Sequence, residues 1–337
     1  MIIIEKDMNY LDSLKSIAIK NRSLFQVEID VTKKCNANCF FCYQGDTHID
    51  KDEITFEEIK SLLKELKKLG TYYIGYSGGE PYARKDFAKI VECSKDLGFR
   101  VSIITNGHLM TLSDIDNLYR IGVERLTFSF HSTKRHIYNK HFGLKKGSNL
   151  YEKTVENIEY AKKIGLSVGI ATTVTKYNID DINDLLIYFE RIGIGKEQIN
   201  LNLLLEGNQN IGNYRPTKEQ LYRNSKYFVE KENRNGFLCS AGIISCSIDS
   251  QGDVYPCTFF NTPVGNIKNT SLKEIWETSH YLQILRSIDD SKFSKCSDCE
   301  VKSSCNPCFV SNLNESGNIF IPSKSFCLSQ VHKIGEV

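Results

Sequence analysis

The chain has 337 residues, which is long enough for two packing units, and we expect a larger one and a smaller one. Its 43 Lys and Arg nearly balance 41 Asp and Glu, so no overall field attracts nucleic acid or an anionic membrane. The opening apolar run, MIII, is too short for a signal peptide or a membrane span, which places the protein in the cytoplasm. In a reducing compartment the 12 cysteines indicate metal ligation or catalysis rather than disulfides.

A first strand is predicted at FQVEIDVT, residues 25–32, after an N-terminal extension of residues 1–25. Three cysteines follow it directly, at Cys35, Cys39 and Cys42. A structural zinc site takes four ligands, whereas an iron-sulfur cubane held by three cysteines keeps one iron open for something other than protein. The spacing therefore favours a cluster with an open iron in the loop after the first strand.

A helix, a glycine stop and an apolar strand recur five times between residues 55 and 205. The helix at 55–69 shows the pattern best, because Thr55 and Glu58 form a capping box at its start. Its apolar face holds Ile59, Leu62, Leu63 and Leu66. With the first strand, these units predict six parallel strands with helices outside, as a partial barrel or an open sheet. Ligands are then expected at the carboxyl ends of the strands.

A different composition begins after residue 205. EGNQNIGNYRP is typical of a linker, and a helix is predicted at about 217–231, so we assign residues 206–236 to a linker and helix. Residues 237–337 hold eight of the twelve cysteines and one long helical pattern, SLKEIWETSHYLQILRS. Because this segment has few apolar residues for a core, we expect its fold to depend on bound metal. Because paired Cys-x2-Cys is also a zinc-ribbon signature, two zinc sites are the alternative here.

Residues 26–205 resemble the radical S-adenosylmethionine (SAM) enzymes, whose motif is Cys-x3-Cys-x-aromatic-Cys, with Phe41 at the aromatic position. The resemblance implies an α/β fold, a partial (β/α)6 TIM-like barrel. In that family the open iron chelates SAM, and one electron from the cluster cleaves SAM to a 5′-deoxyadenosyl radical that abstracts hydrogen from an unactivated carbon. The implied activity is that of an oxidoreductase or maturase, with flavodoxin or ferredoxin as the low-potential electron donor.

Further marks of that family stand at the ends of predicted strands, as YSGGEP, ITNG and FSFH. By resemblance, the residues expected to contact the cofactor are Gly78, Gly79, Glu80, Pro81, Thr105 and Ser129, together with Phe41. Glycine lets the backbone approach a ligand closely. The alternatives are a simple turn into a helix for the Gly-Gly-Glu segment and ordinary strand-end hydroxyls for Thr105 and Ser129.

The cysteines of residues 237–337 resemble the SPASM extension of a subset of radical SAM enzymes, which implies a C-terminal iron-sulfur domain. In fully ligated relatives the first auxiliary 4Fe-4S cluster corresponds to Cys239, Cys246, Cys257 and Cys308. The second corresponds to Cys296, Cys299, Cys305 and Cys327. The chain departs from the SPASM pattern by having two residues instead of three between Cys305 and Cys308. The resemblance thus implies three 4Fe-4S clusters in all. In the alternative, Cys246 is an ordinary strand residue and does not bind the first auxiliary cluster.

SPASM proteins most often modify peptides or proteins, so the leading hypothesis is maturation of a ribosomal peptide by thioether or carbon-carbon crosslinking, oxidation or epimerisation. Many such relatives carry a leader-binding domain before the barrel, and here we expect that role to fall to a separate protein or to be absent. One alternative keeps the radical chemistry and takes a tetrapyrrole as substrate. Another, of a different class, is a zinc-binding adaptor on an inert barrel.

The loop after the fourth strand, HSTKRHIYNKHFGLKKGS, is rich in basic residues and histidines. It is expected to hold the cofactor carboxylate or an acidic peptide, or else to form a solvated lid. His131, His136 and His141 are expected at the surface rather than as ligands. Cys93, on the helix after GGEP, is expected to be a small buried hydrophobe.

Overall fold

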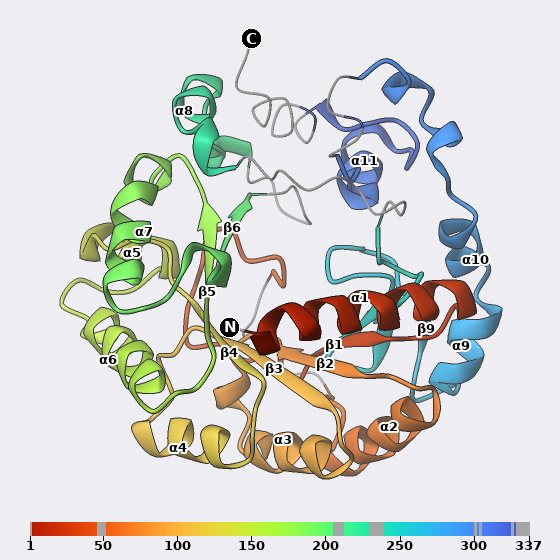
Figure 1. Cartoon of the computed structure of the whole chain (residues 1–337), viewed down its shortest axis with the longest axis horizontal. Helices are drawn as coiled ribbons and strands as arrows, with labels where there is room; N and C mark the ends of the chain where they lie inside the picture. Colours follow the sequence, from red (N-terminus) through yellow and green to blue (C-terminus); the bar gives the residue numbers. More distant parts are fainter. Residues whose placement is uncertain are drawn as a thin grey trace. The chain divides into compact units, whose positions relative to one another are not determined.

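Figure 1 shows the chain as a computed structural model, which describes residues 2–45, 52–204, 212–228, 239–299, 302, 305–324 and 327. The strands are β1 (Gln26–Asp30), β2 (Tyr73–Ser77), β3 (Arg100–Thr105), β4 (Arg125–Ser129), β5 (Val168–Val174), β6 (Ile199–Leu203), β7 (Ser245–Ile248), β8 (Asp253–Tyr255) and β9 (Gly265–Asn266). The α-helices are α1 (Ile2–Asn21), α2 (Phe56–Lys68), α3 (Phe87–Asp96), α4 (Leu112–Arg120), α5 (Arg135–Phe142), α6 (Leu150–Lys163), α7 (Ile182–Arg191), α8 (Lys218–Arg223), α9 (Leu272–Thr278), α10 (His280–Arg286) and α11 (Phe309–Ser316). Short 3-10 helices are η1 (Pro81–Ala83), η2 (Ile179–Asp181), η3 (Lys196–Gln198), η4 (Gly212–Tyr214), η5 (Ser225–Tyr227), η6 (Asp290–Lys292) and η7 (Ser294–Cys296).

The predicted repeat of helix, glycine and strand is confirmed in all five places. Each glycine has a positive φ, between 73° and 90°, directly after its helix; these are Gly70, Gly98, Gly122, Gly165 and Gly193. Helix α2 carries the predicted capping box, in which Thr55 Oγ1 accepts from the Glu58 N–H and Glu58 accepts from the Thr55 N–H. Its four apolar residues are buried as expected.

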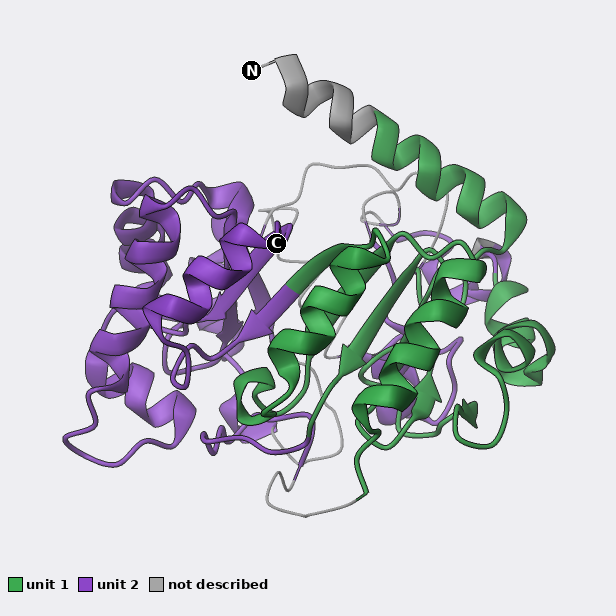
Figure 2. Cartoon of the chain, turned by 90° about the horizontal axis from the view of Figure 1, so that it is seen from below, with its two compact units in different colours: residues 1–32, 50–102, 240–288 green, residues 33–49, 103–239, 289–337 purple. Residues whose placement is uncertain are grey.

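The chain divides into two compact units (Figure 2). Unit 1 comprises Met1–Thr32, Asp50–Ser102 and Ser240–Ile288, and unit 2 comprises Lys33–Ile49, Ile103–Cys239 and Asp289–Val337. In unit 1, β1 pairs in parallel with β2 and β7, and antiparallel β8 and β9 follow; in unit 2, β4, β5 and β6 are parallel. Strand β3 crosses the division, and the strand order is β6-β5-β4-β3-β2-β1-β7-β8-β9.

The sheet of unit 1 has a helix face and an inner face. Tyr76 of β2 marks the helix face, because its hydroxyl hydrogen-bonds to Ser94 of α3 and its ring packs on Phe87, with centroids 5.9 Å apart. Side chains alternate along a strand, so the residues beside Tyr76 point to the inner face. Glu28 of β1 lies on the inner face opposite Gly75, where a Cβ would collide with its carboxylate. Glycine at position 75 therefore makes room for Glu28.

The predicted long helix near residues 271–287 is wrong, because the chain forms α9 and α10 with a break at Ser279. Ser279 has an extended ψ of 116°. On one continuous helix Leu282 would point roughly 240° around the axis from Trp276. The break allows both side chains to be buried, at 4% exposure for Trp276 and 0% for Leu282. The Trp276 indole N–H also donates to the Arg22 carbonyl, 2.9 Å away.

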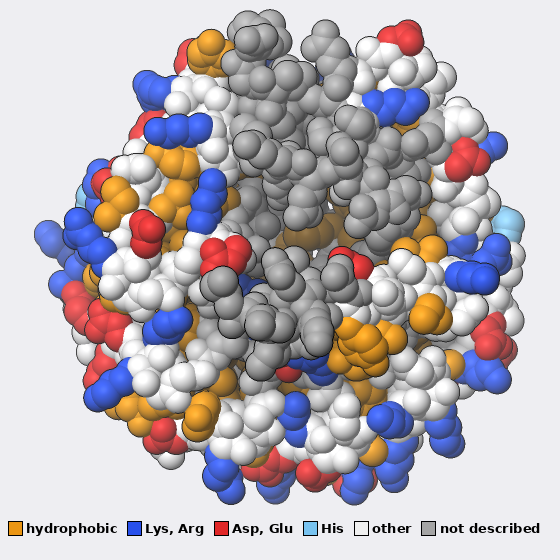
Figure 3. All heavy atoms as spheres, in the orientation of Figure 1, with side chains coloured by type: hydrophobic (Ala, Val, Ile, Leu, Met, Phe, Trp, Pro, Cys, Tyr) orange, Lys and Arg blue, Asp and Glu red, His pale blue; other side chains and the backbone are white. Residues whose placement is uncertain are grey.

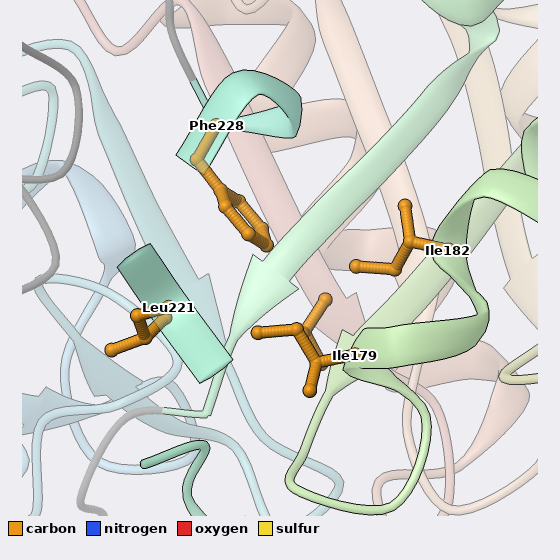
Figure 4. Close-up of a cluster of buried hydrophobic side chains, with 5 residues drawn as sticks. Ile179, Ile182, Leu221 and Phe228 are labelled. Carbon is orange, nitrogen blue, oxygen red and sulfur yellow. The ribbon is translucent and has the colours of Figure 1, made fainter. Parts of the chain in front are cut away.

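The predicted helix at 217–231 is shorter in the structure. Helix α8 begins at the Thr217 cap, where a capping box forms with Gln220, and ends at Arg223; residues 229–238 lie outside the described part. Leu221 of α8 and Phe228, directly after η5, join a buried cluster with Val174 of β5, Ile179 of η2 and Ile182 of α7 (Figure 4). This cluster holds α8 and η5 against the outer layer of unit 2.

Helix α1 occupies most of the segment for which the sequence predicted only an extension. No helix in the described ranges combines the length and apolar character needed to cross a membrane. Acidic and basic side chains are interspersed over the face shown in Figure 3, as the near-zero net charge leads one to expect.

Candidate metal and cofactor site

The loop after β1 brings the three cysteines of the first motif together in unit 2. Cys35, Cys39 and Cys42 are all half-buried. Burial raises the pKa of the Cys39 thiol, and the charges of Cys42 and Cys35 raise it further, so the three sulfurs are near enough to repel one another as thiolates. A cationic cluster iron would relieve that repulsion. The described residues contain no group of three His, Cys, Asp or Glu side chains arranged to hold a single metal ion.

Backbone contacts fix this loop on the end of α5. The Asn38 N–H donates to the Phe142 carbonyl at 3.0 Å. Gly143 ends α5 with φ 61°, and a Cβ there would collide with the Asn38 carbonyl oxygen. Only glycine fits a position with both a left-handed backbone and this close contact. Gly143 therefore allows the cysteine loop to lie directly on the helix terminus.

Amide donors reach the sulfur of Cys35. The Ala37 N–H lies 3.4 Å from Cys35 Sγ, and Asn106 Nδ2 lies 3.8 Å from it. Asn106 also donates to Asn36 Oδ1 at 3.0 Å and accepts from the His108 N–H at 2.8 Å. Hydrogen bonds to cluster sulfurs tune an iron-sulfur centre. Asn106 belongs to the ITNG motif, in which the resemblance implied Thr105 as the contact residue instead.

The GGEP turn of unit 1 packs on the end of β1. Gly78 has φ 135°, and a Cβ there would lie 2.5 Å from the Thr32 carbonyl oxygen. That oxygen also accepts from the Gly79 N–H at 2.7 Å. Glu80 is fully buried and caps η1 by accepting from the Tyr82 N–H, so its carboxylate has a structural partner. Among the described residues, Gly78 therefore lies closest to the backbone of Thr32, immediately before the cysteine loop.

The two strand-end hydroxyls differ in availability. Thr105 Oγ1 is buried and accepts from the Gly107 N–H at 2.9 Å, which is the role of an ordinary turn residue. Ser129, at the end of β4, is half-buried, and its hydroxyl makes no hydrogen bond within the described part of the chain. Of the two, Ser129 retains the capacity to contact a ligand.

The expectation that His131 and His141 lie at the surface is wrong, whereas His136 is exposed as expected. His131 is 3% exposed, and its ring lies edge-on to Phe41 with centroids 5.0 Å apart. Its Nδ1 accepts from the Thr173 N–H at 3.1 Å, so the neutral ring carries its proton on Nε2. The sequence does not reveal this burial. His131 lies between β4 and α5, and α5 carries His141 on its buried side and His136 on its exposed side.

All three buried histidines of this region are neutral at pH 7. Burial, then the charges of His141 and His108, lowers the pKa of His131 well below 6.5. Burial, more than Lys140, lowers the pKa of His141 to about 4, although its hydrogen bond to Ile137 opposes the shift. Burial and Lys153 lower the pKa of His108 to about 4 as well. The buried side chains next to the cysteine loop are therefore uncharged at pH 7 at these three histidines.

His108 gives a pH-dependent stability that can be measured. Its Nδ1 is buried with no hydrogen-bond partner among the described residues, and its Nε2 bonds the Tyr138 hydroxyl at 2.8 Å. The unfolded chain takes up this proton near pH 6.5 and the folded chain only near pH 4. Stability is therefore lost as pH falls through that window, by about 2 kcal/mol between pH 7.5 and 5. In urea unfolding, His108→Gln should lose about 2 kcal/mol less free energy of unfolding between pH 7.5 and 5 than wild type does. The control His136→Gln, at an exposed histidine, should show the same pH dependence as wild type. The same pH dependence in all three proteins would contradict the assignment.

Aromatic rings and lysines line the other side of the cysteine loop in unit 2. Phe40 packs on Tyr214 with centroids 4.4 Å apart and on Tyr177 at 5.9 Å. Lys140 Nζ lies 3.4 Å from the Tyr177 ring centroid, and Lys176 Nζ lies 5.4 Å from it. This aromatic-lysine group is half-exposed and offers flat surfaces together with positive charge. Sequence reasoning missed it because its members come from four separate segments: the loop after β1, helix α5, the loop after β5, and η4.

The structure brings some of the C-terminal cysteines together. Burial, then the charges of Cys296 and Cys299, raises the pKa of Cys327, which places these three near one another in unit 2. Cys308 caps α11 through its carbonyl. Cys246 is buried in β7 of unit 1. Cys93 is half-buried rather than fully buried.

Comparison with known proteins agrees with the cysteine pattern. Residues 29–188 match the radical SAM superfamily, and residues 239–300 match SPASM, an iron-sulfur cluster-binding domain. The chain has a radical SAM domain followed by a SPASM domain. These domains bind SAM and iron-sulfur clusters, and the chain is an enzyme.

Relatives of this radical SAM protein with assigned activities are distant. The AdoMet-dependent heme synthase of Methanosarcina barkeri is 24% identical over 89% of this chain and 95% of its own length. The enzyme of that name from Oleidesulfovibrio alaskensis is 23% identical over 90% of this chain and 87% of its own. A probable GTP 3′,8-cyclase of Thermococcus kodakarensis is 32% identical, over 51% of this chain and 55% of its own length.

Solved structures show the same fold over almost the whole chain. SuiB of Streptococcus suis, bound to its precursor peptide SuiA, aligns with a TM-score of 0.73 at 19% identity, covering 93% of this chain and 78% of that one. The enzyme anSMEcpe, with AdoMet and the Kp18Cys peptide, aligns at 0.73 and 19% identity over 92% and 96%. The predicted TIM-like partial barrel with a C-terminal SPASM domain is thus confirmed.

Proposed function

We propose that this radical SAM protein abstracts hydrogen from a peptide substrate during its post-translational maturation. The observation that carries the proposal is the half-buried trio Cys35, Cys39 and Cys42, held close after β1 in a chain whose residues 239–300 match SPASM. When bound there, a 4Fe-4S cluster with SAM supplies a 5′-deoxyadenosyl radical. The proposal divides the chain into a barrel at residues 26–205, a linker and helix at 206–236, and an auxiliary-cluster domain at 237–337. The radical SAM match at 29–188 lies within the first range, and the SPASM match at 239–300 lies within the third.

The protein's own residues hold and shield this chemistry. The amide donors on Cys35 stabilise charge on the sulfur, and the Gly78 turn fixes the start of the cysteine loop through Thr32. The buried, uncharged ring of His131 packs on Phe41 and shields one side of the cysteine loop from water, which would protect a reactive intermediate from side reactions. Ser129 offers a hydroxyl toward the bound cofactor.

The inner face of unit 1 favours a peptide over a polyanion. Glu28 and Asp30 of β1 point to this face, and burial raises the pKa of Glu28. Burial and then the charges of Asp249 and Asp253 raise the pKa of Tyr255 on β8, so carboxylates gather there also. A substrate with several carboxylates would be repelled by Asp249 and Asp253, whereas the raised pKa of Glu28 favours its neutral form and adds nothing to that repulsion. A peptide amide or ammonium group would be attracted.

A second candidate is a carboxylated tetrapyrrole. The match with this chain spans 87% to 95% of the length of the two heme synthases. The aromatic-lysine group of Phe40, Tyr177 and Tyr214 with Lys140 and Lys176 would suit a flat anionic molecule, because rings stack and the ammonium groups pair with carboxylates.

The two candidates are separated by one anaerobic experiment. The reconstituted protein is incubated with SAM, dithionite and either peptides encoded beside its gene or a porphyrin tetracarboxylate, and the products are analysed by mass spectrometry. The proposal expects a mass change in a peptide that accompanies 5′-deoxyadenosine. A change only in the porphyrin transfers the assignment to the tetrapyrrole, and the triple variant Cys35→Ala/Cys39→Ala/Cys42→Ala is the control that must leave both unchanged.

A further inference from the structure

Cys246 lies on the helix face of the unit 1 sheet. It pairs in register with Val27, and Ile248 pairs with Ile29. None of the four side chains is more than 2% exposed. Paired residues of parallel strands point to the same face, and Ile29 pairs in turn with Tyr76, which contacts α3. The Cys246 thiol therefore belongs to the packed layer between sheet and helices.

Arg286 of α10 occupies the space beside this thiol. Its Nε donates to the Gly242 carbonyl at 2.7 Å and its Nη1 to the Trp276 carbonyl at 2.8 Å, while the guanidinium lies 4.2 Å from the Trp276 ring centroid. Its Nη2 is buried with no hydrogen-bond partner in the described part. The charges that act on Cys246 are those of Arg286 and Glu28, and no other described cysteine contributes.

The segment that carries Cys257 is attached to the opposite face. Ser247 follows Cys246 and so points to the inner face, where it pairs with Tyr255. Thr258, the residue directly after Cys257, hydrogen-bonds through Oγ1 to Ser247 Oγ at 3.4 Å. The backbone of β7 thus separates the Cys246 thiol from this attachment.

We infer that Cys246 is a packing residue of the helix face and not a ligand of an auxiliary cluster. The inference rests on the proposed function, since it takes the chain to bind auxiliary clusters at its SPASM cysteines. Cys239, Cys257 and Cys308 remain as the cysteines that the SPASM resemblance implies for the first auxiliary cluster.

Metal content tests this inference without any substrate. Anaerobically reconstituted Cys246→Ala should keep the iron and sulfide content and the electron paramagnetic resonance (EPR) spectrum of wild type. Cys257→Ala, the matched change at a retained ligand, should lose about four irons per chain. Cys246→Val, which refills the packed layer, should behave as wild type if alanine weakens the fold. A loss of iron or an altered cluster spectrum in both Cys246 variants overturns the inference. The metal measurement uses no peptide, so a failed peptide assay leaves its result standing.

Discussion

Cys39→Ala should reduce 5′-deoxyadenosine formation by at least about a thousandfold, to the background of the reagents. Cys39 is the thiol of the first motif whose pKa burial raises, with Cys42 and Cys35 adding to the shift. Its loss leaves two cysteines, which cannot hold a cubane with only one open iron. The measurement is anaerobic incubation with SAM and dithionite, with chromatography of the nucleoside product.

Cys93→Ala is the matched control for that experiment. Cys93 is also half-buried but stands on α3, outside both cysteine motifs. The control should cleave SAM at the wild-type rate. Wild-type turnover by Cys39→Ala would contradict the assignment of the cluster to this loop.

Gly78→Ala should destabilise the protein by about 3 kcal/mol or more. The new Cβ would lie 2.5 Å from the Thr32 carbonyl oxygen, at a φ of 135° that side chains rarely adopt. Relief of the clash would also move the Gly79 N–H away from Thr32, and with it the start of the cysteine loop. Urea unfolding and the SAM dissociation constant measure the two consequences.

Gly70→Ala separates backbone strain from collision. Gly70 has φ 79°, but a Cβ there would meet nothing within 4 Å. Its substitution should cost only about 1 to 2 kcal/mol, the penalty of a left-handed backbone, and should leave SAM binding unchanged. Equal losses of stability at the two positions would show that the contact with Thr32 is unimportant.

The barrel could be predicted because local and global signals agree there. Each helix of the repeat carries its own stop, and the capping box and apolar face of α2 need no tertiary information. The break at Ser279 could not be foreseen, because local preference allows one continuous helix. Only the need to bury both Trp276 and Leu282 requires two helices.

The spacing of Cys35, Cys39 and Cys42 allows the sequence to propose them as ligands, but it says much less about their surroundings. His131 and His141 each stand beside a phenylalanine in a segment rich in basic and polar residues, and only tertiary packing shows that they are buried. The face of β7 on which Cys246 lies depends on its register with β1, a long-range pairing that no local pattern records.

Pulsed EPR of the reduced protein with isotopically labelled SAM tests the central claim most directly. The claim is an open iron on a cluster held by Cys35, Cys39 and Cys42, which binds SAM through its amino and carboxylate groups. The account predicts hyperfine coupling to 15N-amino and 17O-carboxylate SAM in wild type and its loss in Cys39→Ala. Absence of coupling in a wild-type protein that holds iron and sulfide, or coupling that survives Cys39→Ala, would contradict it.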